Sequence, residues 1–384
     1  MTPAHCLKSR SLILATVLVC GLGLFTHANA QISPIHAFLV DLNSRSATKI
    51  DLGTLGNFRR AYGVNGPRPG INDAGQVAGS FDTAGGFGHV FITGPHGIGM
   101  RDLGQGVGGG INNAGQVVGV YATTEGDFHA FITGPDGMGM RDLGTLGRNA
   151  SIATGINDAG QVVGFFDTAG GPHAFITGPD GTGMRDLGTL GGSQISAHGI
   201  NDAGQVVGYS ETAEGDYHAF ITGPNGMGMR NLGTLGGSIS GAYSINDVGQ
   251  VVGESISAEG DFHAFITGPD GMGMRDLGTL GGYSSSAFDI NDAGQVVGES
   301  GTAEGLTHAF ISPDGEGMVD LNSLVDLPAG IILTRADGIN NNGQVIAMGV
   351  MGVIPEPETY ALMLAGLGLI GLMGGARRRR NSHS

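Results

Sequence analysis

The sequence predicts an all-β protein, a seven-bladed β-propeller of four-stranded blades, and three observations support this. A histidine-led block and a second block of the form Ile-Asn-x-x-Gly-Gln alternate seven times along the chain. From His129 to His308 the histidine blocks follow one another at steps of 44, 45, 45 and 45 residues. Repeats of about 40 to 50 residues built from short strands are typical of propeller blades, whereas leucine-rich solenoids repeat every 20 to 29 or so. Each repeat also offers four strand candidates.

The four candidates follow one another within one repeat. "HAFIT" is apolar and rich in β-branched and aromatic residues, and "GPDGMG" is a turn that leads into "MRDLG". The loop "TLGGSQISA" leads to "AHGIN", and the turn "DAG" leads into "QVVGYS". We therefore expect one blade to begin at each histidine block and to end at the next "QVVG".

The "INDAGQVVG" motif is interpreted as the tight turn of a hairpin. Asn201 and Asp202 are expected to bond their own backbone in an Asx-type turn, and Gly204 to take a positive φ. Val206 and Val207 then re-enter the sheet. The same structural role is predicted for Asn157, Asp158 and Gly160.

Packing between blades is expected to build the core, because one blade alone is a thin sheet with two apolar faces. The predicted core residues are Phe131, Phe175, Phe220, Phe265, Phe310, Val207, Val252 and Val297. The first repeat starts at its "HAF" strand and the last ends at "QVIAMGV", so the two ends of the array should meet and close the ring. An open β-solenoid is the alternative architecture.

The repeated histidines are predicted to be structural residues, each bonded to an aspartate of its own or the neighbouring blade. These residues are His129, His173, His218, His263 and His308. Equivalent positions lie far apart around a ring, and no His-x-His or His-Glu-x-x-His spacing occurs, so we expect no metal site and no other cofactor. Catalysis needs one asymmetric constellation, whereas histidine and aspartate recur in every repeat, so no catalytic residue is assigned.

A binding site is expected where the repeat symmetry breaks. Arg59, Arg60 and Arg68 cluster in an insertion of the first repeat, in a chain with few basic residues. They are candidates for binding an acidic sugar or a phosphate, and the alternative is a solvated loop.

Charge and cysteine content exclude several classes of protein. Six of the 18 basic residues and two of the 34 acidic ones lie in the two end segments, which leaves 12 basic against 32 acidic residues. Such a balance argues against nucleic acid as a partner. Cys6 and Cys20 lie in the N-terminal segment, so the rest of the chain has no thiol for a disulfide, a zinc ligand or a nucleophile.

The two ends predict export. Residues 1–30 have the build of a secretory signal helix, with Lys8 and Arg10 before an apolar stretch and cleavage expected between Ala30 and Gln31. Residues 360–376 are uncharged and, as a helix, would rise roughly 25 Å, barely enough for a transmembrane helix. The cytoplasmic anchor that follows is Arg377, Arg378, Arg379 and Arg380. The organisation expected is therefore a signal peptide at 1–30, a repeat array at 31–353 and a sorting segment at 354–384.

The tail resembles the PEP-CTERM sorting signal of Gram-negative bacteria. Pro355, Glu356 and Pro357 precede the apolar helix and the arginine cluster in the order of that signal. The resemblance implies an exosortase-type processing enzyme, a transient membrane anchor before processing, and delivery to the cell surface or an exopolysaccharide matrix.

The repeats resemble the extracellular HAF-repeat family over roughly residues 36–349, a resemblance that implies an exported repeat protein and little biochemistry. We therefore expect an exported, non-enzymatic surface or matrix module, with exopolysaccharide or other surface proteins as partners. The alternatives are a polysaccharide-acting enzyme, a lyase or glycosidase, and, through the recurring Thr133, Thr177, Thr222 and Thr267, an ice-binding protein.

Overall fold

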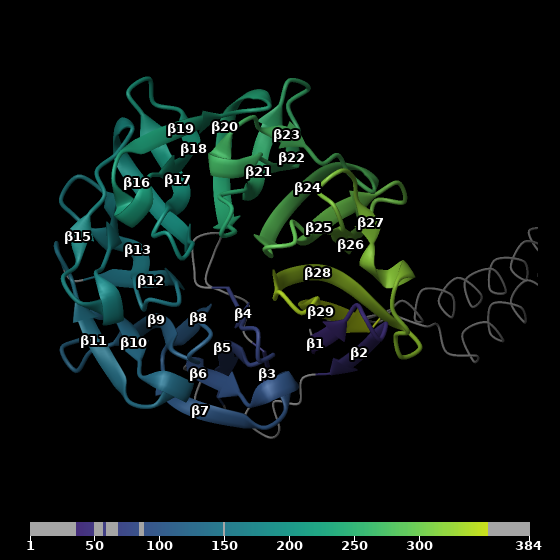
Figure 1. The fold of residues 1–384 in the computed structure, drawn as a ribbon, viewed down its shortest axis with the longest axis horizontal. Helices are drawn as coiled ribbons and strands as arrows, with labels where there is room; N and C mark the ends of the chain where they lie inside the picture. The colour runs from purple at the N-terminus through teal and green to yellow at the C-terminus, as the bar shows by residue number, and fades with distance from the viewer. Residues whose placement is uncertain (1–35, 50–56, 59–67, 84–87, 149, 352–384) are drawn as a thin grey trace, which may run out of the picture. The chain divides into compact units, whose positions relative to one another are not determined.

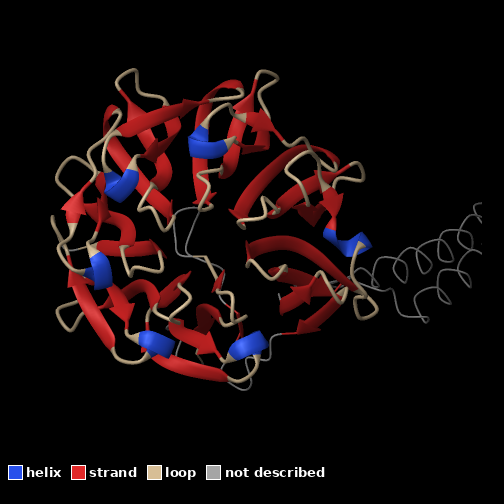
Figure 2. Ribbon diagram, viewed as in Figure 1, coloured by secondary structure: helices blue, strands red, loops and turns tan. Residues whose placement is uncertain are grey.

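Seven antiparallel sheets surround a central axis in the computed structural model, which describes residues 36–49, 57–58, 68–83, 88–148 and 150–351 (Figure 1). Six of these sheets have four strands, and the sheet nearest the N-terminal insertion has a short fifth strand. The only helical segments in the described ranges are six single 3₁₀ turns between strands (Figure 2). The prediction of a seven-bladed β-propeller is confirmed, and the solenoid alternative is wrong.

The blades are numbered in chain order, with the innermost strand first. Blade 1 has β3 (Asn57–Phe58) and β4 (Gly70–Ile71), both paired with β5 (Val77–Asp82), then β6 (Gly88–Thr93) and β7 (Met100–Gln105). Blade 2 has β8 (Val107–Ile111), β9 (Val117–Ala122), β10 (Phe128–Thr133) and β11 (Met140–Gly144). Blade 3 has β12 (Ser151–Ile156), β13 (Val162–Asp167), β14 (Pro172–Ile176) and β15 (Arg185–Asp186).

The next three blades repeat this pattern. Blade 4 has β16 (Gly191–Ile200), β17 (Val206–Thr212), β18 (Tyr217–Thr222) and β19 (Met229–Gly233). Blade 5 has β20 (Gly236–Ile245), β21 (Val251–Ser257), β22 (Phe262–Ile266) and β23 (Arg275–Asp276). Blade 6 has β24 (Gly281–Ile290), β25 (Val296–Thr302), β26 (Thr307–Ser312) and β27 (Val319–Asp320).

Blade 7 joins the two ends of the array. It is built from β28 (Ile331–Ile339), β29 (Gln344–Met351), β1 (His36–Asp41) and β2 (Ser46–Lys49). Strand β1 pairs with β29 over its whole length, from His36 opposite Gly349 to Asp41 opposite Gln344. The expected meeting of the first and last strands is confirmed.

The blade boundaries differ from the sequence expectation. In blade 4 the strand order is β16, β17, β18, β19, so "AHGI" and "QVVG" precede "HAFIT" and "MRNLG" in one sheet. The repeat as written from one histidine to the next therefore spans the outer half of one blade and the inner half of the following one. The stretch "TLGGSQISA", expected as a loop, is the crossover between blades, and most of it belongs to the long inner strand β16. A periodic sequence sets the length of the unit but not its starting point.

The six 3₁₀ turns are η1 (Pro95–Gly97), η2 (Pro135–Gly137), η3 (Pro179–Gly181), η4 (Pro224–Gly226), η5 (Pro269–Gly271) and η6 (Leu321–Ser323). In the first five the middle residue is left-handed, and four of these residues are Asp or Asn, which tolerate that conformation. In η3, η4 and η5 an arginine from the preceding blade donates to the carbonyl of this middle residue, as Arg185 Nη2 does to Asn225 O at 2.7 Å. The turn is thus also a contact between blades.

Each interface between neighbouring blades contains its own apolar cluster. The paired valines of "QVVG" explain how one strand serves two interfaces, because adjacent side chains of a strand point to opposite faces. Val206 packs with Ile176 of blade 3, whereas Val207 packs with Ile221 and Ala242 at the interface with blade 5. The predicted core phenylalanines and valines are buried, which confirms that assignment.

The glycine after the two valines is required by a close approach. A Cβ on Gly208 would lie 2.0 Å from the carbonyl oxygen of Ser196 on the paired inner strand. The equivalent Gly164, Gly253 and Gly298 meet the same obstacle at 1.9 to 2.0 Å. The register of the inner strand shifts just beyond this contact, between Ala197 and Gly199. The inner strand therefore bends where its next residues reach the channel.

Candidate functional site

The asparagines of the seven "IN" motifs form a closed ring of hydrogen bonds around the channel. Each Asn donates from Nδ2 to the backbone carbonyl oxygen of the corresponding Asn in the next blade, at 2.9 to 3.1 Å. The members are Asn72, Asn112, Asn157, Asn201, Asn246, Asn291 and Asn340. Within its own turn, Asn201 Oδ1 accepts from Gln205 N at 2.9 Å, and Gly204 has a φ of +73°. Asn157 and Gly160 make the same turn in blade 3.

The next residue of the motif forms a second closed ring. Its backbone N–H donates to Oδ1 of the corresponding residue in the next blade, at 2.8 to 3.0 Å. This carboxylate ring consists of Asp73, Asn113, Asp158, Asp202, Asp247, Asp292 and Asn341. The expectation that Asp202 bonds its own backbone is corrected: its Oδ1 accepts from Asp158 N. The partner in another blade was not visible in a local sequence pattern.

The two rings surround the mouth of a cavity of about 300 Å³ on the propeller axis. All seven blades contribute their "x-Gly-Ile-Asn-Asp" segments or equivalents to its lining. Burial at the mouth raises the pKa of Asp202, and the neighbouring carboxylates of Asp247, Asp158 and Asp292 raise it further, against the Asp158 N–H bond that lowers it. The mouth is therefore a concentration of negative charge.

The inner wall of the cavity is where the blades differ. The residue three positions before the ring asparagine differs in every blade: Pro69, Gly109, Thr154, His198, Tyr243, Phe288 and Asp337. Thr154, His198, Tyr243, Phe288 and Asp337 line the cavity. Sequence reasoning missed this site, although the signal is present in the sequence as the variable position within an otherwise regular motif.

Arg68 crosses to this variable wall from blade 1. Its guanidinium carbon lies 4.2 Å from the ring centroids of both Tyr243 and Phe288, a cation–π geometry. Arg335 lies against the Phe288 ring as well, at 4.1 Å. Burial and the charge of Arg335 lower the pKa of Arg68. Of the three arginines predicted to bind an anion, Arg68 therefore lies in the cavity wall, and Arg59 and Arg60 lie outside the described residues.

Two more titratable groups of the wall have perturbed acidities. Burial, with a smaller effect from Arg68, lowers the pKa of His198 to about 3, so the imidazole is neutral near pH 7. Burial raises the pKa of Asp289 to about 6, although Ser244 Oγ donates to it at 2.6 Å and Ile339 N at 2.8 Å. Asp337 is held by Arg335 Nε at 2.5 Å.

The repeated histidines lie in the outer half of each blade, away from the cavity lining. His129, His173, His263 and His308 bond an aspartate on the adjacent outer strand or at its end through Nδ1, at 2.7 to 2.9 Å. His218 bonds Asn231 in the same way at 2.8 Å. Within the described ranges, no three histidine, cysteine or acidic side chains gather as metal ligands would.

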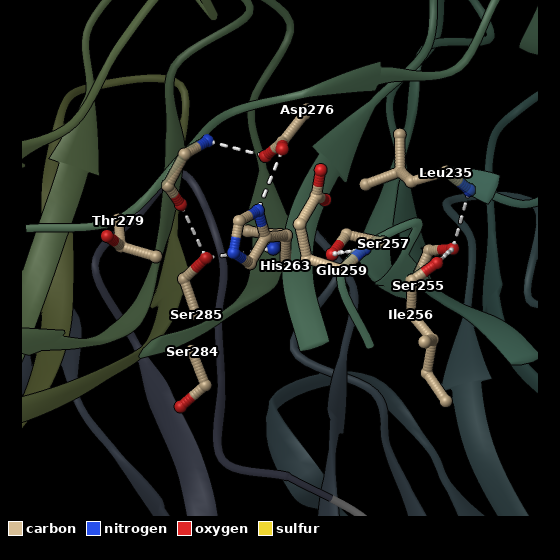
Figure 3. A network of polar contacts seen from close by, with 12 residues as sticks. Leu235, Ser255, Ile256, Ser257, Glu259, His263, Asp276, Thr279, Ser284 and Ser285 are labelled. Atoms are coloured by element: carbon tan, nitrogen blue, oxygen red, sulfur yellow. Dashed lines mark hydrogen bonds and ion pairs between the residues drawn. The ribbon is translucent and has the colours of Figure 1, made fainter. Parts of the chain in front are cut away.

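One of these histidine pairs lies beside a serine and invites comparison with a catalytic triad (Figure 3). His263 Nδ1 lies 2.7 Å from Asp276 Oδ2, and Ser285 stands next to the imidazole. Ser285 Oγ, however, donates to the carbonyl oxygen of Gly278 at 2.6 Å and accepts from Ala264 N at 2.9 Å. A nucleophilic serine would donate to the histidine, so this hydroxyl bridges strands in the structure.

The threonine row is buried. Thr133, Thr177, Thr222 and Thr267 are only 2 to 3% exposed. The Oγ1 of Thr222 accepts from Val206 N at 2.9 Å, a bond within the sheet. These threonines therefore present no surface to ice, and the ice-binding alternative based on them is wrong.

The calls at the chain ends lie outside the described residues. They comprise the signal cleavage at Ala30 and Gln31, the motif Pro355, Glu356 and Pro357, the helix 360–376, and Arg377, Arg378, Arg379 and Arg380. In the part of the chain that the structure describes, no helix is long and apolar enough to span a bilayer.

Comparison with known proteins gives a match for the tail. Residues 353–380 match the PEP-CTERM protein-sorting motif. This motif indicates a protein that is exported, sorted to the surface of a Gram-negative cell and processed by an exosortase. No curated protein matches the chain.

Solved structures that resemble the chain include a peptidase and a TolB protein. The acylaminoacyl peptidase of Pyrococcus horikoshii is 10% identical with a TM-score of 0.50, over 74% of this chain and 48% of that one. TolB from Acinetobacter baumannii is 10% identical with a TM-score of 0.47, over 72% of this chain and 64% of that one. The chain thus spans less than two thirds of either protein, and at this identity the likeness concerns the fold alone.

Proposed function

We propose that this chain is an exported, non-enzymatic binding protein of the cell surface or of an exopolysaccharide matrix, and that its channel cavity is the binding site. The observation that carries the proposal is the contrast within each inner strand. The ring asparagines are the same in all seven blades, whereas the position three residues earlier, which lines the cavity in six blades, differs in all seven. A concave site with a few distinct polar groups is the usual form of a ligand site.

The polar residues that recur in every blade are occupied by structural contacts. The histidines bond the adjacent outer strand, and the ring residues bond the next blade. Ser285, the serine beside His263, donates its hydroxyl hydrogen bond to the carbonyl oxygen of Gly278. These contacts support a binding module rather than a lyase or a glycosidase, the enzymatic alternatives. Membership of the HAF-repeat family stays a prediction from the sequence.

The proposal is tested with the segment 31–353, which contains every described strand, including the β1–β29 pair that closes the ring. The purified protein is incubated with the exopolysaccharide of its own host, and both retention on the polymer and the length of the polymer are measured. We expect retention without shortening. Shortened polymer, or no retention, contradicts the proposal.

A substitution that fills the cavity tests whether retention on the polymer depends on the channel. Thr154→Tyr introduces at the blade 3 position the side chain that blade 5 already carries as Tyr243. Met227→Tyr, at a turn residue that is 64% exposed, is the matched control. Thr154→Tyr loses the bond from Thr154 Oγ1 to Ala197 O of the next blade, so the assay is run well below the melting temperature of both variants. Retention should then fall for Thr154→Tyr and stay unchanged for Met227→Tyr.

A further inference from the structure

The carboxylate ring is not evenly neutralised around its circumference. Asn113 Nδ2 contacts Asp73 Oδ2 at 3.2 Å and Asp158 Oδ2 at 2.9 Å. Asn341 Nδ2 contacts Asp292 Oδ2 at 2.9 Å and Asp73 Oδ2 at 3.3 Å. No described residue donates to Oδ2 of Asp202 or Asp247, which are neighbours in the ring. On the side of the mouth formed by blades 4 and 5, two adjacent carboxylates therefore each accept one backbone N–H at Oδ1 and have no side-chain donor at Oδ2 among the described residues.

Deeper in the same cavity, Arg68 and His198 of the variable wall need hydrogen-bond acceptors; these two residues are called the floor below. Arg68 Nη1 and His198 Nε2 are buried nitrogens for which the described residues provide no hydrogen-bond partner, and both side chains line the cavity. Arg68 Nη1 is a donor, and His198 Nε2 is a donor in the tautomer that carries the proton there; a buried donor without an acceptor costs about 1–3 kcal/mol. A ligand oxygen is the group that would satisfy them.

Mouth and floor together define the chemistry of the occupant. It must carry a cation to meet Asp202 and Asp247, and oxygen acceptors to meet Arg68 and His198. A lysine or arginine side chain supplies the cation but only donors at its tip, so it leaves the floor unsatisfied. A uronic acid or a phosphate supplies acceptors but is repelled by the five carboxylates of the mouth. A cavity of about 300 Å³ also favours a small unit.

We propose that the channel cavity binds an amino sugar with a free ammonium group, with the ammonium against Asp202 and Asp247 and the sugar oxygens against Arg68 and His198. This inference rests on the proposed function and names its ligand class. It differs from the acidic sugar expected for the arginines, because the mouth in front of Arg68 is acidic.

The experiment measures binding of four probes to the segment 31–353 by isothermal titration calorimetry, at a pH that keeps the amine protonated. The probes are glucosamine oligomers, N-acetylglucosamine oligomers of the same length, oligogalacturonate and oligolysine. We expect the glucosamine oligomers to bind at least tenfold more tightly than each of the others. Their affinity should also fall as salt rises, because added ions screen the carboxylates.

A pair of charge-matched variants locates the binding. Asp202→Asn with Asp247→Asn removes the two unneutralised carboxylates, and Asn already occupies two places in the ring, as Asn113 and Asn341. Asp180→Asn with Asp270→Asn removes the same charge from the 3₁₀ turns η3 and η5, which are not part of the cavity lining and whose equivalent in blade 4 already carries Asn225. Glucosamine binding should weaken at least tenfold in the ring variant and stay within twofold in the turn variant.

Several results would overturn the inference. Equal affinity for glucosamine and N-acetylglucosamine oligomers, tighter binding of oligolysine or oligogalacturonate, or an equal loss in both variants each contradicts it. Glucosamine monomer binding as tightly as the oligomers would identify the free sugar as the ligand source; weaker monomer binding would identify the polymer, and both outcomes support the amino-sugar site. If the host polymer is retained but no glucosamine probe binds, the proposed function stands and this inference fails.

Discussion

Two sets of residues in the same inner strands, three positions apart, follow opposite rules. The ring asparagines, such as Asn201, are the same in all seven blades, whereas the wall residues, such as His198, differ in all seven. Each asparagine bonds the next blade, and because every interface has the same geometry, every blade needs the same residue. The wall residues face the cavity, where no such geometry is imposed. Repetition in this sequence therefore marks contacts between blades, and variation marks the cavity.

The largest effect is expected from the repeated part, at a buried phenylalanine. Phe220→Ala removes a fully buried ring from the interface of blades 3 and 4 and should lower the free energy of unfolding by about 3–5 kcal/mol. Denaturant titration measures it. Phe128→Ala, at a position that is 55% exposed, is the control and should stay within about 0.5 kcal/mol of the parent. Equal losses in the two variants would mean that the interfaces do not hold the ring.

In the cavity wall, the buried Asp289 should make the stability of the protein depend on pH. Burial raises the pKa of Asp289 to about 6, above its value of 3.8 in an unfolded chain. The stabilisation by this protonated acid is therefore complete below about pH 4 and is lost as the pH rises through 6. Asp289→Asn cannot ionise but loses one of the two oxygens that accept from Ser244 Oγ and Ile339 N, so its stability relative to the parent should be about 3 kcal/mol more favourable at pH 8 than at pH 4.

Thermal melts of both proteins across the pH range measure this change in their stability difference. Asp292→Asn, at an exposed ring residue, provides the control and should change the stability by less than about 0.5 kcal/mol at pH 8. A constant difference between Asp289→Asn and the parent from pH 4 to pH 8 would contradict the assigned ionisation.

A substitution in the asparagine ring should lower the free energy of unfolding by less than the loss of a core phenylalanine does. Asn201→Ala removes the bond to Asn246 O and leaves Gln205 N without its acceptor, which predicts a loss of about 1–3 kcal/mol. Asp202→Asn keeps the Oδ1 that accepts from Asp158 N and should change the stability by less than about 0.5 kcal/mol. Denaturant titration compares them, and an equal effect in the two variants would contradict the structural role of the asparagines.

The smallest effect is expected at the outer histidines. His263→Ala loses a partly exposed bond to Asp276, whose other oxygen still accepts from Gly278 N, so the loss should be about 0.5–1 kcal/mol. Elemental analysis of the parent and the variant should give the same metal content. A stoichiometric metal that disappears with His263 would show that the outer histidines are ligands.

The repeated features of the fold could be predicted from the sequence, whereas the blade boundaries and the hydrogen bonds between blades could not. Periodicity predicted seven blades of four strands and the buried Phe220 and Val207, because these depend on local alternation repeated at a fixed length. It could not set the blade boundary, since any starting point in a repeat is equivalent. It also missed the bond between Asp158 and Asp202, 44 residues apart, because both residues look like ordinary turn residues.

The cavity was predicted only in part. A break in symmetry was expected to mark the site, and Arg68 does lie in its wall. The basic insertion is distinct in the sequence because arginine is rare in this chain. The variable position at His198, Tyr243 and Phe288 is a single residue inside a regular motif, so it does not stand out. Side chains from different blades meet there only after the ring has closed, so their proximity is a tertiary property.

The pairing of β1 with β29 has a consequence for biogenesis. The first strand to be translocated finds its partner only when the last strand arrives, since His36 lies opposite Gly349. Until then blade 7 exposes an unpaired strand edge, which is prone to aggregation. Closure of the ring is therefore a late event, and a chain truncated before residue 344 would lack β29 and leave β1 and β28 without their partner strand.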